Sequence, residues 1–279
     1  MHAGNQTAKA HAFRKLHDRS DVLILPNAWD AASARLLEAA GFPAIATTSG
    51  GVAWSLGYAD GELAPFDELV AAATRITRAV GVPVTVDMES GYGELPEAVA
   101  ESVRRMIDAG AVGINLEDSM RSRRGLRDLD DAAARLQAAR NSAIGAGVPI
   151  VINARVDTYL IGFGSSEDER LAETIRRAQA YLAAGADCIY PIGLGEPATL
   201  EALIAELDVP INVAARPGMP GVAELARMGV ARVSTATRLP AVAYSAADRA
   251  ARQLLANGSF EGLDPPLKHD DLQRLFDAG

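Results

Sequence analysis

One local pattern recurs along most of the chain: an alanine-rich run with helical spacing, then glycine, then a short segment rich in β-branched residues. Glycine just past a helix tolerates the left-handed backbone conformation, and the apolar runs that follow have the length and composition of buried strands. The pattern predicts a helix-to-strand junction at seven places: Ala40-Gly41, Val80-Gly81, Ala109-Gly110, Ala146-Gly147, Ala184-Gly185, Met228-Gly229 and, without glycine, Leu207-Asp208.

The apolar run at residues 22–26 adds a first strand, which makes eight strand segments, each followed by a helical pattern. Eight parallel βα units are what a (β/α)8 barrel (TIM barrel) requires, and such a barrel uses about 250 residues. The 279 residues therefore predict a single α/β domain over 1–279, with the barrel at about 20–256 and short extensions at both ends. In this fold the reacting groups gather at the carboxyl ends of the strands.

Acidic side chains end two neighbouring strands of the predicted barrel. Asp87 and Glu89 end the third strand, where a spacing of two places them on the same side, and Glu117 ends the fourth. Carboxylates that converge in a partly dehydrated mouth repel each other unless a cation neutralises them, and oxygen-only ligands suit Mg²⁺ or Mn²⁺. The pattern favours a metal site, and the alternative is a set of solvated or helix-capping acids.

Two further strand ends carry groups suited to binding an anion. The second strand is followed by Ser49-Gly50-Gly51, whose backbone N–H groups can hold an anionic oxygen, although the same residues also suit an ordinary turn. Arg155 ends the fifth strand, where it can grip a substrate carboxylate with two N–H groups or pair with Asp157 or Glu117. We favour the substrate-binding role for Arg155.

Three residues beside the strands receive structural interpretations. Trp29 follows the first strand and is expected to form a wall of the site. Asp30 has the place of a helix N-cap before a run of small residues. Cys188 opens the sixth strand, so we expect a buried core thiol at the end of the barrel opposite the chemistry.

Charge and hydropathy exclude several classes of partner. The net charge of −9 argues against nucleic acid, and the arginines at 121, 123 and 124 form only a local patch. The amino-terminal residues lack the apolar core of a secretory signal, and no stretch reaches membrane-spanning length. We therefore expect a cytoplasmic protein that acts on a small molecule and does not bind a membrane.

Histidine is absent from the predicted barrel, since all four histidines lie outside it: His2, His11, His17 and His269. This disfavours a histidine base, a Ser-His-Asp arrangement and a histidine-ligated zinc site, unless the terminus of a neighbouring subunit enters the mouth. The chemistry is expected to depend on carboxylates, a metal ion, arginine and tyrosine.

Several ordered motifs resemble those of the isocitrate lyase/phosphoenolpyruvate phosphonomutase superfamily, and they span nearly the whole chain. They are the segments 26–34 (PNAWDAASA), 48–51 (TSGG), 55–60 (SLGYAD), 86–93 (VDMESGYG), 115–118 (NLED) and 153–157 (NARVD). The resemblance implies a (β/α)8 barrel that exchanges its last helix with a neighbour, usually in a dimer of dimers. It also implies that Mg²⁺ binds an α-oxoacid or its enolate.

The resemblance assigns roles to individual residues. Asp87 would be the direct metal ligand, and Asp60, Glu89 and Glu117 would reach the metal mostly through water. Ser49, Gly50 and Gly51 would hold the substrate carboxylate together with Arg155.

The departures from the superfamily pattern are informative. Members that cleave isocitrate or methylisocitrate carry a cysteine, which donates a proton, on the loop after the fourth strand, and the phosphonomutases carry a lysine and an asparagine there. Residues 119–130 of this chain have none of the four residue types Cys, His, Lys and Asn. On the seventh strand, Asn212 stands two residues before the position where the lyases place an asparagine, and Arg216 is extra. The pattern resembles a phosphonomutase-like branch whose reactions are not fixed by motif.

These observations predict a Mg²⁺-dependent enzyme that acts on a small α-oxoacid through an enolate. The favoured reaction is carbon–carbon bond cleavage or decarboxylation, with isocitrate and methylisocitrate as poor substrates. Without a loop cysteine, water, Tyr58 or a loop residue would supply the proton, and Tyr92 is a second candidate. The candidate catalytic residues are Tyr58, Asp60 and Arg155, and Asn212 joins the substrate-binding set.

Two alternatives stay open. One is a phosphonopyruvate-type mutase or hydrolase that uses the arginines at 121, 123 and 124 for phosphoryl charge. The other is a metal-dependent α-oxoacid binder with little turnover. The alanine-rich helix expected at about 240–255 permits close helix contact, so we also predict a homo-oligomer, a dimer or a tetramer.

Overall fold

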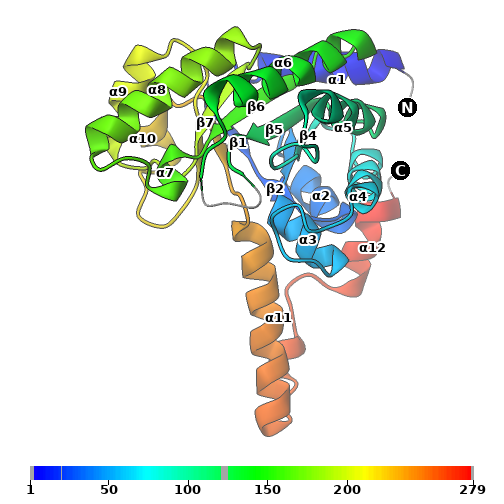
Figure 1. The fold of residues 1–279 in the computed structure, drawn as a ribbon. Coiled ribbons are helices and arrows are strands. Elements are labelled where there is room, and N and C mark those ends of the chain that lie inside the picture. The colour runs from blue at the N-terminus through cyan, green and yellow to red at the C-terminus, as the bar shows by residue number, and fades with distance from the viewer. Residues whose placement is uncertain (1–2, 20, 121–124, 278–279) are drawn as a thin grey trace.

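The structure, a computed structural model, describes residues 3–19, 21–120 and 125–277. Strands occupy its centre and helices surround them (Figure 1). One sheet contains, in order, β2 (Asn27–Ala28), β3 (Ile45–Thr47), β4 (Val84–Asp87), β5 (Gly113–Glu117), β6 (Val151–Val156) and β7 (Cys188–Pro191). The other contains β1 (Leu23–Leu25), β9 (Arg232–Ser234) and β8 (Asn212–Ala214). Every strand pairing in both sheets is parallel, which confirms the predicted α/β class.

All seven predicted helix-to-strand junctions are confirmed. The helices that precede β3 to β9 are α2 (Ala31–Ala39), α4 (Phe66–Ala79), α5 (Pro96–Asp108), α6 (Leu129–Ala146), α8 (Glu167–Ala183), α9 (Pro197–Glu206) and α10 (Val222–Arg227). Positive φ angles occur at five of the junction glycines: Gly41, Gly110, Gly147, Gly185 and Gly229. Gly81 is the exception: its φ angle is not positive, and its N–H donates to the Glu38 carboxylate at 2.6 Å.

The first predicted strand is divided in the structure. Pro26 separates β1 from β2, and these two short strands belong to different sheets. Proline has no N–H to donate to a neighbouring strand, so regular pairing stops at this residue. A single bridge between Ile189 and Ile211 joins the other edges of the two sheets.

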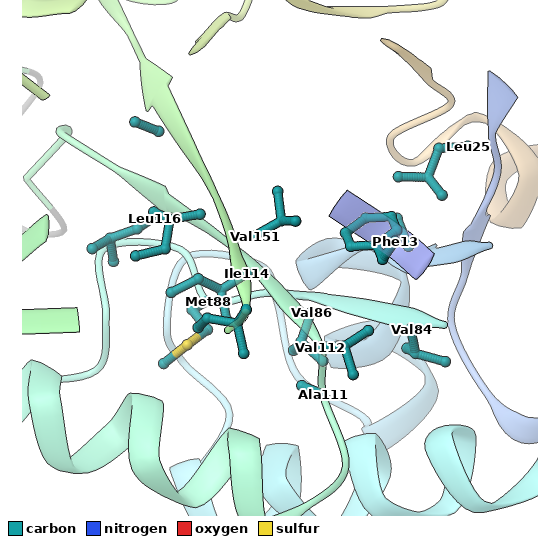
Figure 2. Close-up of a cluster of buried hydrophobic side chains, with 14 of the residues drawn as sticks. Phe13, Leu25, Val84, Val86, Met88, Ala111, Val112, Ile114, Leu116 and Val151 are labelled. Atoms are coloured by element: carbon teal, nitrogen blue, oxygen red, sulfur yellow. The ribbon is translucent and has the colours of Figure 1, made fainter. Parts of the chain in front are cut away.

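Alternation along each strand separates apolar from polar side chains. Val84 and Val86 of β4 belong to the buried hydrophobic cluster drawn in Figure 2. Thr85 and Asp87, between and after them, point to the opposite side of the strand. Acids and amides at the ends of the strands therefore face the interior enclosed by the strands, while the apolar residues pack under the helices.

The amino-terminal helix α1 (Ala3–Lys15) covers the amino ends of the strands. Gln6 donates at 2.7 Å to the carbonyl oxygen of Ile107, in the last turn of α5, and at 3.0 Å to that of Ala111, shortly before β5. Arg14 pairs with Asp187, directly before β7, at 2.5 Å. Phe13 is fully buried and lies near Leu25 in Figure 2. This helix closes the end of the strands that is opposite to the carboxyl ends.

The carboxyl-terminal part of the chain extends away from the rest. Helix α11 (Arg238–Asn257) projects outward in Figure 1, and a 3₁₀ turn, η1 (Glu261–Leu263), follows it. The chain then returns to α12 (His269–Asp277), where the carbonyl oxygen of Leu275 accepts a hydrogen bond from Arg35 of α2. None of the helices in the described ranges is both long and apolar enough to span a bilayer.

The predicted N-cap at Asp30 is confirmed. Its carboxylate accepts the backbone N–H of Ser33 at 2.7 Å, and the Ser33 hydroxyl accepts the backbone N–H of Asp30 at 3.0 Å. This reciprocal pair satisfies two otherwise free donors at the start of α2. The capped helix begins directly after the first strand and so fixes the path of the chain past Trp29.

Burial of His17 below the strands predicts an acid-sensitive contribution to stability. Burial, followed by the nearby Arg232 charge, lowers the pKa of His17 from 6.5 to about 4. Between these two pH values the unfolded chain takes up a proton that the folded chain does not. The free energy of unfolding should therefore decrease as the pH falls from 6.5 to 4, by up to roughly 3 kcal/mol.

Carboxylates titrate over the same range, so the matched control is His17→Leu, which retains the apolar volume and loses the titration. Urea unfolding at pH 7 and pH 4.5 should give a smaller loss of stability for the variant than for the wild type. Equal losses in the two proteins would contradict the prediction.

Candidate active site

A cavity of about 230 Å³ opens at the carboxyl ends of the strands. Its walls come from both sheets and from the loops that follow the strands. The described lining residues are Asn27, Thr48, Ser49, Asp60, Asp87, Asn115, Arg155, Leu160, Tyr190, Ile192, Ser234, Ala236 and Thr237. Four of the predicted site residues are thereby brought together, namely Ser49, Asp60, Asp87 and Arg155.

Asp87 ends β4 beside the start of helix α3 (Ser49–Leu56). Its carboxylate accepts the backbone N–H of Ser49 at 3.2 Å and that of Glu89 at 3.4 Å. Burial raises the pKa of Asp87, and the Arg155 guanidinium acts in the opposite direction. Asp60 is on the loop after α3 and lines the same cavity. It packs so closely against the start of α3 that a Cβ on Gly50 would be 3.0 Å from its Oδ2 atom. Two carboxylates thus share the cavity.

Glu89 does not line the cavity but holds the loop that carries Asp60. Its carboxylate accepts the backbone N–H of Glu62 at 2.7 Å and the Tyr92 hydroxyl at 2.8 Å. Glu62, Glu89 and Tyr92 all have positive φ angles, of 56°, 50° and 53°, which non-glycine residues rarely adopt. Burial raises the pKa of Glu89 to about 7. We interpret this strained cluster as the anchor that fixes Asp60 beside Asp87.

Arg155 is paired with two acids. Its Nη1 atom lies 2.5 Å from Glu117, while Nε and Nη2 form a two-pronged bond to Asp157 at 2.6 and 2.9 Å. The two-pronged grip expected for a substrate carboxylate is therefore used by Asp157. Burial raises the pKa of Glu117, and Arg155 opposes that shift. Arg155 still lines the cavity, but as part of this ion-pair group.

Asp118 and its partners lie behind the ion pairs of Arg155 and hold Asp157 in place. Asp118 accepts the backbone N–H of Asp157 at 2.9 Å, the Tyr181 hydroxyl at 2.6 Å and an Arg177 N–H at 3.2 Å. Asp118 is 2% exposed, so it is a buried acid and not a solvated loop residue. Side chains along β5 point alternately to its two sides. Asp118 directly follows Glu117, so its side chain points away from the cavity.

The acids do not form a ready-made metal cluster. Among the residues that the structure describes, no three or more His, Cys, Asp or Glu side chains converge in a geometry that could hold an ion. Asp60 and Asp87 face the cavity, whereas Glu89 and Glu117 are turned to protein donors. Mg²⁺ commonly takes one or two carboxylates and keeps several waters, so the pair Asp60 and Asp87 suits it chemically.

Residues 49–51 form the first turn of α3 instead of an open turn. Thr48 is the N-cap, and Ser49 donates its backbone N–H to Asp87. Gly51 is needed for packing, because a Cβ there would lie 2.9 Å from Trp29 and 3.0 Å from Pro240. Gly50 and Gly51 do not line the cavity themselves. They allow α3 to approach Asp60 on one side and the start of α11 on the other.

Other predicted residues lie outside the cavity wall. Tyr58 donates to Glu68 of α4 at 2.8 Å, and Tyr92 donates to Glu89. The Trp29 ring packs near Tyr244 of α11, with 6.4 Å between centroids. None of these three aromatic residues is among the described lining residues.

Asn212 and Cys188 are both fully buried inside the strands. Asn212 does not line the cavity. Burial raises the pKa of the Cys188 thiol to about 12, as expected for a core cysteine. Cys188 is the first residue of β7, as predicted, and it does not line the cavity, whereas Tyr190, two residues later, does.

Sequence reasoning missed several lining residues. Asn27 links β2 to the segment that follows β9, because its Oδ1 accepts the backbone N–H groups of Thr235 and Ala236 at 2.8 and 2.9 Å. Asn115 and Tyr190 lie on the same inward-facing positions of β5 and β7 as Glu117 and Cys188. Because side chains two residues apart on a strand point to the same side, the residue two positions before Glu117 could have been expected at the cavity, and that residue is Asn115. The arginines at 121, 123 and 124 lie outside the described residues.

Comparisons with known proteins agree with these motifs. The model of the phosphoenolpyruvate phosphomutase family matches residues 13–255. An uncharacterized protein of Mycobacterium tuberculosis (strain CDC 1551 / Oshkosh) is 37% identical over 95% of this chain and 96% of its own length. A 2-methylisocitrate lyase of Escherichia coli (strain K12) is 31% identical over 72% of this chain and 67% of its own.

An oxaloacetate decarboxylase of Bradyrhizobium diazoefficiens is 32% identical over 68% of this chain and 65% of its own length. The crystal structure of a candidate phosphonomutase from Burkholderia cenocepacia J2315 superposes with a TM-score of 0.84 at 45% identity, covering 88% of this chain and 99% of the other. The chain therefore belongs to the phosphoenolpyruvate phosphomutase family, within the isocitrate lyase/phosphoenolpyruvate phosphonomutase superfamily whose motifs it carries.

Proposed function

We propose that this protein is a Mg²⁺-dependent enzyme that breaks a carbon–carbon bond at C3 of a small α-oxoacid, as a lyase or a decarboxylase. The observation that carries the proposal is the pair of carboxylates, Asp60 and Asp87, in a cavity of about 230 Å³. A lyase and an oxaloacetate decarboxylase among the relatives support the same reaction class. Oxygen ligands of this kind would hold Mg²⁺, which supplies a Lewis acid that stabilises negative charge on the α-oxoacid.

The chain's own residues would orient and shield the substrate. Thr48 and Ser49 at the start of α3 offer polar groups to a substrate oxygen, and the guanidinium of Arg155, held by Glu117 and Asp157, lines another part of the wall. Leu160 and Ile192 add apolar side chains to the wall and would reduce the access of water. Breaking the bond at C3 leaves an enolate, which needs a proton at C3.

Among the described residues that line the cavity, the tyrosine is Tyr190 and not the predicted Tyr58. Burial raises the pKa of its hydroxyl to about 12, so Tyr190 stays protonated at neutral pH. We assign the proton donor to Tyr190 or to water. No cysteine or histidine is among the described lining residues, which supports the expectation that isocitrate and methylisocitrate are poor substrates.

We further propose that the two sheets form one closed (β/α)8 barrel domain and that α11 packs on a second copy of the chain. The pairing of β1 with β9 and the bridge between Ile189 and Ile211 support closure. On α11, Val242 and Leu255 are 66% and 89% exposed, which favours a partner over solvent around this helix. A cytoplasmic location remains the expectation from the sequence.

Proton exchange tests the proposed chemistry directly. With Mg²⁺ in D₂O, the wild-type protein should exchange the methyl protons of pyruvate, because stabilising the enolate makes those protons labile. Proton NMR would show the methyl signal disappear with time. A protein that binds pyruvate without exchange would instead be a binder. Phosphorus NMR on phosphonopyruvate is the companion measurement, since release or migration of its phosphorus would favour the phosphorus–carbon alternative.

Asp87→Asn should abolish Mg²⁺-dependent exchange while the fold remains intact. The amide keeps the shape and can still accept the Ser49 N–H, and the loss of a charge relieves repulsion with Asp60. Isothermal titration of Mg²⁺ and thermal unfolding would measure the two effects. Asp208→Asn, a change at an exposed acid, is the matched control and should retain Mg²⁺ binding. Full activity in Asp87→Asn would rule out the metal assignment.

Light scattering tests the predicted assembly. The wild-type protein should have at least twice the mass of one chain. Val242→Glu and Leu255→Glu together should shift it toward the monomer, since any charge that the interface covers would have to be desolvated. A wild-type monomer would refute the exchange of α11.

A further inference from the structure

Arg232 lies in the interior of the strands without an acidic partner. It begins β9, is fully buried, and forms no ion pair with any described residue. Its Nε and Nη1 atoms have no hydrogen-bond partner, and its one described hydrogen bond runs from Nη2 to Oδ1 of Asn115 at 3.3 Å. A buried, unpaired cation is costly, so its presence directly below the cavity calls for a functional reason.

The contact between Arg232 and Asn115 determines which way the amide points. A guanidinium can only donate hydrogen bonds, so the Asn115 atom that faces Arg232 must be the oxygen. The same Oδ1 also accepts from Nδ2 of Asn153 at 2.8 Å. With the oxygen held by two donors below, the Asn115 N–H₂ group is left for the cavity that Asn115 lines.

We propose that Arg232 is a positioning residue that holds the Asn115 amide with its N–H₂ toward the cavity, so that Asn115 donates to an oxygen of the substrate. The inference rests on the proposed function, in which the cavity binds an α-oxoacid. Asn115 is also the register partner of Asp87, so its N–H₂ lies beside the carboxylates. The pair therefore selects ligands that present an oxygen acceptor, such as a carboxylate or an enolate, at the floor of the cavity.

Oxalate, a small dicarboxylate, is the probe for this arrangement. Isothermal titration with Mg²⁺ should show that Asn115→Asp binds oxalate about 10- to 100-fold more weakly than the wild type. The variant replaces an N–H donor with a carboxylate, which repels the negatively charged oxalate. Arg232→Met should weaken binding by about 10-fold, since the amide is then free to rotate. Arg232→Lys keeps a donor-only cation below Asn115, so it should retain binding within about 3-fold.

The side-chain amide of Asn115 gives a readout that does not depend on the ligand. Its ¹⁵N signal, assigned by its absence in Asn115→Asp, should shift in Arg232→Met and stay close to the wild-type position in Arg232→Lys. Thr85→Val is the matched control, because it removes a buried hydroxyl without a partner from the same interior and should change neither the amide signal nor the oxalate affinity. Thermal unfolding of each variant separates a loss of fold from a loss of binding.

The outcomes distinguish the two proposals. If the wild type does not bind oxalate with Mg²⁺, the proposed function fails, and the amide signal alone decides the role of Arg232. If the wild type binds oxalate but Arg232→Met leaves both the amide signal and the affinity unchanged, the positioning role is overturned. If Arg232→Met does not fold, the comparison of Arg232→Lys with Asn115→Asp decides: tight binding by Asn115→Asp would overturn the role of Asn115 as donor.

Discussion

The interaction on which the candidate site depends is the buried contact of Arg155 with Glu117 and Asp157. Three acids meet two arginines where β5 and β6 end, because Asp118 pairs with Arg177 and also accepts the backbone N–H of Asp157 from behind. Removing one member of such a group would leave the others with uncompensated charge in a dehydrated environment. This interdependence gives the cavity one rigid wall, while the opposite wall is formed by α3 and the loop that carries Asp60.

The site therefore divides into groups that face the cavity and groups that hold them. Asp60 and Asp87 belong to the first set, and Glu89, Asp118 and Asp157 to the second. The carboxylates look alike in sequence, but their surroundings differ: Asp87 receives backbone N–H groups at long distances, whereas both oxygens of Glu89 are bonded at 2.7 and 2.8 Å. A carboxylate with two short protein bonds has little capacity left for a ligand.

Local signals predicted the order of the elements and the location of the site. Glycines after helices and β-branched runs depend on neighbouring residues alone, so all seven junctions and the cap at Asp30 could be predicted. The alternation of β4 and β5 likewise placed Asp87 at the cavity. The role of Glu89 could not be predicted, because it depends on Glu62, whose approach is set by loop conformation. The pairing of Arg155 with Asp157 and Glu117 was recognised as an alternative, but the sequence could not decide between it and substrate binding. Arg232 was missed since an arginine at the start of a strand usually indicates exposure, and only the enclosed interior makes it informative.

Helix α1 has a consequence for how the chain reaches this structure. Its contacts lie far along the sequence: Gln6 bonds Ala111, 105 residues later, and Arg14 bonds Asp187, 173 residues later. During synthesis, which proceeds from the amino terminus, α1 emerges first and must wait for most of the strands before its partners exist. Until then Phe13 and Ala10, both fully buried in the finished molecule, remain open to solvent and to other chains. The helix that seals the strands is thus among the last elements to acquire its contacts, and nascent chains are exposed to aggregation for that whole interval.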